Sequence, residues 1–215
     1  MTRREWTLDG LRICAFEEKT SAPALYVHMS AEEAEALADE RWTVVAIDGV
    51  DWGCDLTPWP AKTVFRGQPD FAGGADAHLK RLTEQVVPMV ERALEPRSRM
   101  LAGYSLAGLF AVYAALKSEM FESVASASGS MWYPGFEEFA EQSARVPECV
   151  YFSVGEREKF GRNAAFRSIE DCTQRVCSLL ERRGARTVFE LNPGGHFDDP
   201  VGRVRRAIEW LSGWI

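Results

Sequence analysis

The 215 residues of the chain are predicted to form a single α/β domain, 1–215, with a mostly parallel sheet covered by helices on both faces. After residue 24, short apolar runs alternate with longer stretches of helix-forming residues, as in successive β-α units. The length suffices for one substantial core, and no linker, internal repeat or low-complexity segment divides the chain. In such sheets, functional groups gather at the carboxyl ends of the strands.

The first part of the chain is expected to form three strands and a helix. Residues 5–16 contain two strands around an Asp-Gly pair, which is a strong hairpin signal. The run 24–28 is the third strand. The helix expected over 32–40 begins with a capping-box pattern, in which Ser30 is the cap and Glu33 stands three residues later.

The next stretch is expected to contain a strand, a long irregular loop and a helix. Residues 42–47 are rich in Val and Ile and predict a buried strand. Residues 48–74 carry several Pro and Gly residues and predict a long irregular loop, which in a compact domain usually has a function. Residues 75–94 predict an amphipathic helix that Pro88 should kink.

The second half of the chain alternates regularly. Strands are expected at 100–102, 123–128, 149–154 and 187–191, and helices at 106–116, 135–145, 162–183 and 200–214. The glycine that follows residue 183 is a common helix stop. A Gly-rich loop, 192–197, joins the last strand to the closing helix.

The turn between the strand at 100–102 and the next helix carries the candidate nucleophile. Its sequence, Gly103-Tyr-Ser-Leu-Ala-Gly108, is close to the Gly-x-Ser-x-Gly nucleophile elbow. Small neighbours of Ser105 let the strand and the helix approach closely, and Gly103 meets that need. Ala107 departs from the pattern by one methyl group. The alternative interpretation is an ordinary serine N-cap after a strand.

Three polar residues follow strands in the order Ser105, then Glu156 or Glu158, then His196. Nucleophile, acid, histidine is the order found in α/β hydrolases. His196 would take the proton of the serine hydroxyl and return it to the leaving group, and a carboxylate would fix the imidazole tautomer. Glu158 is preferred because it stands on the turn after the strand, and Glu156 is expected to face solvent or to pair with an arginine. The alternative for His196 is a cap on the final helix.

Two backbone N–H groups are candidates for stabilising an oxyanion. Leu106 opens the helix after the serine, where N–H groups are unpaired and the helix dipole helps. The second donor should come from the loop after the third strand, with Met29 preferred and Ser30 as the alternative. His28 could lie beside the site, and His78 is expected to be structural.

Four segments resemble a known family: 55–58 (Asp-Leu-Thr-Pro), 103–110, 126–133 and 154–159. They resemble the esterase D-like and enterobactin (siderophore) esterase-like branch of the α/β hydrolases, which implies that fold and ester hydrolysis without a cofactor. In this family the acid, where one is used, ends a Gly-x-x-Glu motif, which corresponds to Glu158; some members use a Ser–His pair alone. The short N-terminal half departs from the family and leaves no room for a large cap domain.

Without a cap, the pocket must be built from loops. Its expected aromatic walls, which suit aryl or acyl groups, are Trp52, Trp59, Trp132 and Tyr133. The alternative is that these rings are core. The acids Asp48, Asp51 and Asp55 lack the further ligands of a calcium loop, so loop hydrogen bonds are expected and no metal is predicted.

Composition limits the partners of the protein. A net charge of −7 argues against a nucleic-acid surface and against anionic membranes. No stretch is long and apolar enough for a membrane span, and the first residues contain no secretory signal. The five cysteines are expected to be free thiols in a reducing cytoplasm. The arginine-rich stretches around residues 97–99, 182–183 and 203–206 are expected to be solvated helix faces, and a homo-oligomer is possible.

The leading hypothesis is a serine esterase that acts on a small-molecule ester through an acyl-enzyme. An acyltransferase with the same triad is the second hypothesis. The third is a catalytically inactive binding protein that keeps the fold.

Overall fold

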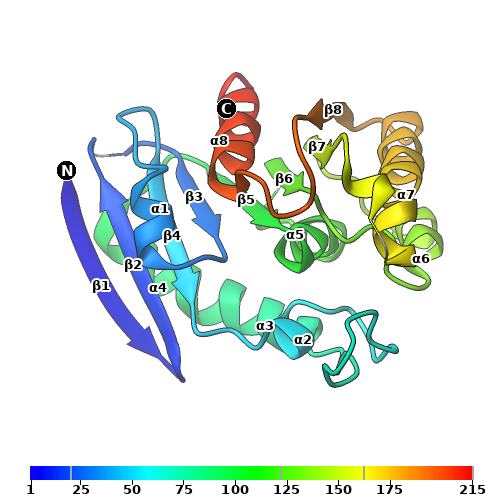
Figure 1. The fold of residues 1–215 in the computed structure, drawn as a ribbon. Helices are drawn as coiled ribbons and strands as arrows, with labels where there is room; N and C mark the ends of the chain where they lie inside the picture. Colours follow the sequence, from blue (N-terminus) through cyan, green and yellow to red (C-terminus); the bar gives the residue numbers. More distant parts are fainter. Residues whose placement is uncertain (20, 122, 162, 215) are drawn as a thin grey trace.

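One mixed sheet runs through the described part of the chain (Figure 1). The computed structural model describes residues 1–19, 21–121, 123–161 and 163–214. The strands are β1 (Thr2–Leu8), β2 (Leu11–Glu17), β3 (Ala24–Val27), β4 (Thr43–Asp48), β5 (Arg99–Tyr104), β6 (Ser123–Ala127), β7 (Cys149–Gly155) and β8 (Arg186–Asn192). Their order is β1-β2-β4-β3-β5-β6-β7-β8. The β1–β2 and β2–β4 pairs are antiparallel and all the others are parallel.

Helices cover both faces of the sheet, as the sequence predicts. They are α1 (Ala31–Glu35), α2 (Trp52–Asp55), α3 (Ala75–Arg81), α4 (Val87–Leu94), α5 (Leu106–Lys117), α6 (Phe136–Gln142), α7 (Ala164–Arg182) and α8 (Pro200–Ser212). Apolar residues of α3 to α7 form the core on one face, and those of α1 and α8 form the core on the other. No helix in the described ranges is long and apolar enough to cross a membrane.

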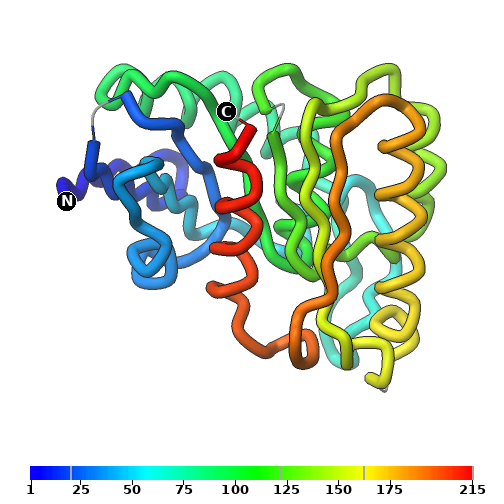
Figure 2. Tube along the Cα trace, turned by 90° about the horizontal axis from the view of Figure 1, so that it is seen from above, coloured from blue at the N-terminus to red at the C-terminus, as the bar shows by residue number. Residues whose placement is uncertain are grey.

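The closing helix ties the two halves of the chain together. Figure 2 shows α8, in red, running across the middle of the molecule between the blue N-terminal strands and the orange β8. It packs against β5, β6 and β7. The loop that precedes α8 is thereby held near the carboxyl ends of these strands, where the candidate residues lie.

The helix predicted over 75–94 is interrupted. A π-helical turn, Leu82–Val86, separates α3 from α4 and ends two residues before Pro88. Proline has no N–H and its ring would collide with the carbonyl four residues earlier, so the wider turn accommodates it. The predicted kink therefore takes the form of a π-helical turn. The helix predicted over 162–183 begins at Ala164, and Arg162 lies outside the described residues.

Aspartates organise the start of the loop 48–74. Asp51 caps α2 and accepts hydrogen bonds from the N–H groups of Gly53 and Cys54, at 3.0 and 3.1 Å. Asp55 accepts from the Asp51 N–H at 3.1 Å. Asp48 accepts from the neighbouring Gly49 N–H at 2.7 Å. These carboxylates make the loop hydrogen bonds expected from the sequence.

Candidate active site

The serine turn between β5 and α5 has the backbone of a strained elbow. Ser105 adopts φ 56° and ψ −120°, a conformation that non-glycine residues rarely adopt. A Cβ on Gly103 would lie 2.2 Å from the carbonyl group of Ala107. On Gly108 it would lie 3.0 Å from the backbone of Gly103 and from that of Gly129, which follows β6. The second position that must lack a side chain is therefore 108. This explains why Ala107 is accommodated where the motif has its second glycine.

Three of the predicted site residues lie in contact. His196 Nε2 is 3.1 Å from Ser105 Oγ. His196 Nδ1 is 2.6 Å from Glu158 Oε2. Because the carboxylate can only accept, Nδ1 carries the proton and the Nε2 lone pair faces the serine hydroxyl. Glu156, the alternative acid, is exposed.

The carboxylate of Glu158 is buried and held from several sides. Its Oε1 atom accepts from Ser128 Oγ at 2.7 Å and from the Gly155 N–H at 2.6 Å. Burial alone would raise the pKa of this carboxyl, but hydrogen bonds from His196, Ser128 and Gly155 and the attraction of His196 outweigh it. The pKa therefore lies below its usual value, and the group is a carboxylate at neutral pH.

Arg203 is a functional neighbour that the sequence analysis missed. The prediction that it belongs to a solvated helix face is wrong, because the side chain is fully buried. Its Nη1 donates to Glu158 Oε1 at 3.0 Å, and Nη2 donates to the carbonyls of Pro193 and Gly195 at 3.0 and 2.8 Å. It thereby links the acid to the His196 loop. Its position one turn before Ala207 on the apolar stripe of α8 was the available signal.

One of the candidate oxyanion donors is already engaged. The Ser30 N–H donates to Glu33 Oε2 at 3.1 Å in the predicted capping box. The Met29 N–H makes no such bond to any residue that the structure describes, and Met29 lines the same cavity as Ser105. Leu106 is the first residue of α5, so its N–H belongs to the unpaired first turn.

The other two histidines of the chain, His28 and His78, form a buried pair beside the site. His28 Nε2 is 2.8 Å from His78 Nε2, and Arg81 Nη2 is 3.0 Å from His78 Nδ1. Since a guanidinium only donates, His78 Nδ1 accepts, its Nε2–H donates to His28, and His28 carries its own proton on Nδ1. Burial lowers the pKa of His78 to about 4 and lowers the pKa of His28 well below its usual value, aided by the neighbouring His78 and Arg81. Both rings are neutral at pH 7.

A cavity of about 470 Å³ opens over the serine. Ser105 and His196 lie in its lining, together with the apolar side chains of Met29, Ile47, Val50, Trp52, Phe197 and Val201. Of the four predicted aromatic wall residues, Trp52 lines this cavity.

The other three aromatic residues pack with one another and with the loop core. Trp59 Nε1 donates to the Pro134 carbonyl at 2.8 Å, and the buried Tyr133 donates to the Trp59 carbonyl at 2.5 Å. Trp132 and Tyr133 both contact Phe71. The structure places these rings outside the cavity lining, as the alternative interpretation of them as core expects. Among the described residues, no group of three or more His, Cys, Asp or Glu could hold a metal ion.

A sheet with this strand order and a strained serine turn at the end of β5 is that of an α/β hydrolase. The family comparison narrows this class. Residues 6–196 match the esterase family whose description is "Putative esterase". The chain therefore belongs to this esterase family and is a carboxylic ester hydrolase.

One protein in sequence and two solved structures in fold are similar to this chain. "Uncharacterized protein YbbA" from Bacillus subtilis (strain 168) is 33% identical over 171 residues, which are 74% of this chain and 68% of YbbA. Siderophore hydrolase EstA from Aspergillus nidulans superposes with a TM-score of 0.77 at 21% identity, over 98% of this chain and 94% of EstA. An IroE-like serine hydrolase from Shewanella oneidensis superposes with a TM-score of 0.79 at 15% identity, over 99% and 79%. At these identities the two solved structures show a shared fold alone.

Proposed function

We propose that the protein hydrolyses small-molecule carboxylic esters through an acyl-enzyme formed on Ser105. The observation that carries this proposal is the continuous chain of contacts from Ser105 Oγ through His196 to Glu158, at 3.1 and 2.6 Å. Similarity of fold to a protein named as a serine hydrolase adds support.

The reaction follows from the roles of these groups. Ser105 Oγ attacks the ester carbonyl carbon while His196 Nε2 takes its proton. The N–H groups of Leu106 and Met29 are the proposed donors to the oxyanion. Collapse of the intermediate breaks the bond to the alcohol, which receives the proton from His196. Water then attacks the acyl carbon while His196 Nε2 takes a proton from it. The bond from that carbon to Ser105 Oγ breaks, the carboxylic acid is released, and Ser105 recovers its proton from His196.

The remaining parts of the site have supporting roles. Glu158 would keep the imidazole in the productive tautomer and stabilise its cation. Trp52 is the proposed aromatic contact for substrate. The five cysteines, all unpaired, support the predicted location in a reducing cytoplasm.

Pre-steady-state hydrolysis of an activated aryl ester tests this function. If deacylation is slower than acylation, one equivalent of phenol should appear in an initial burst, and Ser105→Ala should abolish both the burst and the turnover. Ester hydrolysis by Ser105→Ala at the wild-type rate would exclude this serine as the nucleophile.

A further inference from the structure

The wall of the catalytic cavity carries negative charge on an otherwise mostly apolar surface. Most of its wall is apolar, and the ionised side chains in the described lining are the carboxylates of Asp48 and Glu33. Lys and Arg are absent from that described lining. The two acids come from neighbouring elements, the end of β4 and the first turn of α1. The charge in the lining therefore has one sign.

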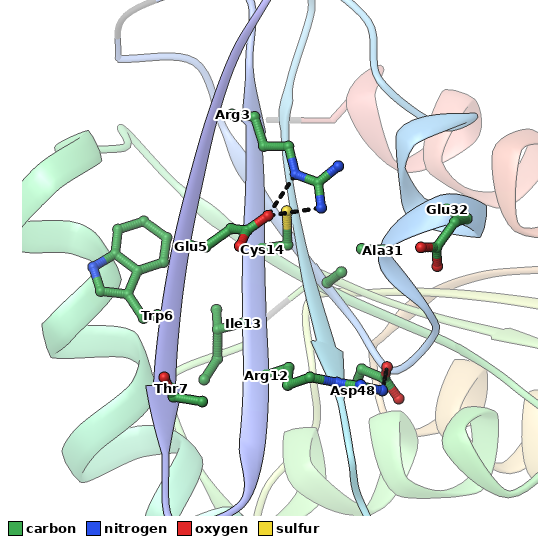
Figure 3. A pocket seen from close by; sticks show the side chains of 11 residues that line it. Arg3, Glu5, Trp6, Thr7, Arg12, Ile13, Cys14, Ala31, Glu32 and Asp48 are labelled. Atoms are coloured by element: carbon green, nitrogen blue, oxygen red, sulfur yellow. Dashed lines mark hydrogen bonds and ion pairs between the residues drawn. The ribbon is translucent and has the colours of Figure 1, made fainter.

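Nearby arginines do not make this region positively charged, because each of them lies beside a carboxylate. Figure 3 shows the adjoining groove on the β1–β2 side, where Arg3 lies beside Glu5 and Arg12 beside Asp48. Each of these two arginines forms an ion pair with that carboxylate. Glu32 lies on the rim of the same groove. Asp48 lines both the groove and the catalytic cavity. Counting Asp48, which the groove shares with the cavity, the groove thus holds three carboxylates and the two guanidinium groups of Arg3 and Arg12.

The carboxylate of Glu33 is fixed in place at this edge. Its Oε2 atom accepts from Ser30 N at 3.1 Å and from Ser30 Oγ at 2.8 Å. Those bonds belong to the capping box of α1, so the charge is held beside Ser30, which itself lines the cavity. Glu33 is itself exposed, so these hydrogen bonds to Ser30 are what keep its charge at the edge of the cavity.

We propose that this cavity selects esters by charge: the part of the ester that enters it is apolar and neutral or cationic, and an anionic group is disfavoured. The inference rests on the proposed ester hydrolysis and specifies its substrate class. An anionic group would lose its hydration against the apolar wall. It would also meet the repulsion of Glu33 and of the part of the Asp48 charge that the ion pair with Arg12 does not offset, whereas a trimethylammonium group would be attracted by these carboxylates and would contact Trp52 favourably.

The test compares esters that differ only in charge. One series consists of p-nitrophenyl esters of a neutral acid, a dicarboxylic acid and a trimethylammonium acid of equal length. A second series carries the same three groups on the thiol side of a thioester. We expect kcat/KM for the anionic member to fall about fivefold or more below the neutral one in at least one series, the factor that one unit charge exerts on another across ~4 Å of water. The deficit should shrink in high salt.

Charge-neutral variants connect the selectivity to named residues. Glu33→Gln keeps an acceptor for the capping box, and Asp48→Asn keeps an oxygen for the Gly49 N–H. Each should raise the ratio of anionic to neutral kcat/KM about threefold to fivefold. Glu35→Gln is the matched control, because Glu35 is exposed on the same helix and lies outside the cavity lining. This control should leave the ratio at the wild-type value.

Two results would overturn the charge selection. One is equal or faster cleavage of the anionic esters in both series, and the other is an unchanged ratio in both Glu33→Gln and Asp48→Asn. Failure of the proposed function would look different, because then no member of either series would be cleaved in a Ser105-dependent way.

Discussion

Replacement of Glu158 by glutamine removes one charge and one acceptor from the centre of the site. The glutamine carbonyl can still accept from Ser128 and Gly155, but its NH₂ group would then face His196 Nδ1. That nitrogen would have to accept, so the proton would move to Nε2, and the imidazole could no longer take the proton of Ser105. A tautomer error of this kind costs about 10⁴-fold in kcat in an Asp–His–Ser triad. We expect a loss of about 10³- to 10⁴-fold for Glu158→Gln.

The same change should destabilise the protein. The side chains of Glu158 and Arg203 are both fully buried in an ion pair of 3.0 Å. Removal of one partner leaves the guanidinium charge uncompensated, which typically costs about 3–5 kcal/mol of unfolding free energy. The bonds from Arg203 to the carbonyls of Pro193 and Gly195 persist, so the lower half of that range is expected.

Two assays separate these effects. Activity is measured on an aryl ester after titration of active sites, so that only folded enzyme counts, and stability is measured by urea denaturation. Glu156→Gln is the control, since Glu156 stands two residues away and is exposed. Retention of more than a tenth of kcat by folded Glu158→Gln, or a larger loss in Glu156→Gln, would refute the assignment of Glu158 as the orienting acid.

Three further outcomes follow. Gly103→Ala should lower the free energy of unfolding in urea by about 3 kcal/mol, because the new Cβ would lie 2.2 Å from the Ala107 carbonyl group. A loss below 1 kcal/mol would contradict the close approach of β5 and α5. Arg203→Met should reduce kcat and stability together, and wild-type kcat in folded protein would show that the arginine does not hold the His196 loop. The pKa of His78 is about 4 in the folded protein and ~6.5 in the unfolded chain. As the pH falls, the unfolded chain therefore takes up a proton before the folded protein does. Stability should therefore fall by about 2 kcal/mol between pH 7 and pH 5, and by clearly less in His78→Gln; equal losses in both proteins would contradict a buried neutral ring.

Local signals in the sequence carried most of the fold. The Asp-Gly hairpin, the Ser30–Glu33 capping box and the alternation of strands and helices depend on neighbouring residues, and each predicts its own element. The serine elbow is local in the same sense, because Gly103 and Gly108 report the approach of strand and helix. Motif order along the chain then sufficed to place Ser105, Glu158 and His196 at one edge of the sheet.

The misplaced residues depend on contacts between distant segments. Arg203 lies among charged neighbours in sequence, and its partners Glu158 and Ser128 come from the ends of β7 and β6. Trp59 and Tyr133 share a contact across 74 positions of sequence, which no local pattern encodes. Burial of a charged or aromatic side chain is decided by such long-range packing, so composition around the residue predicts it poorly.

The most direct measurement of the central claim is covalent labelling with a fluorophosphonate. Intact mass spectrometry should show one adduct per chain, peptide mapping should locate it on Ser105, and Ser105→Ala should remain unlabelled. Labelling should also slow strongly in a His196→Ala variant, because the serine would lose its base. An unlabelled wild-type protein, or an adduct on any other residue, would contradict the account.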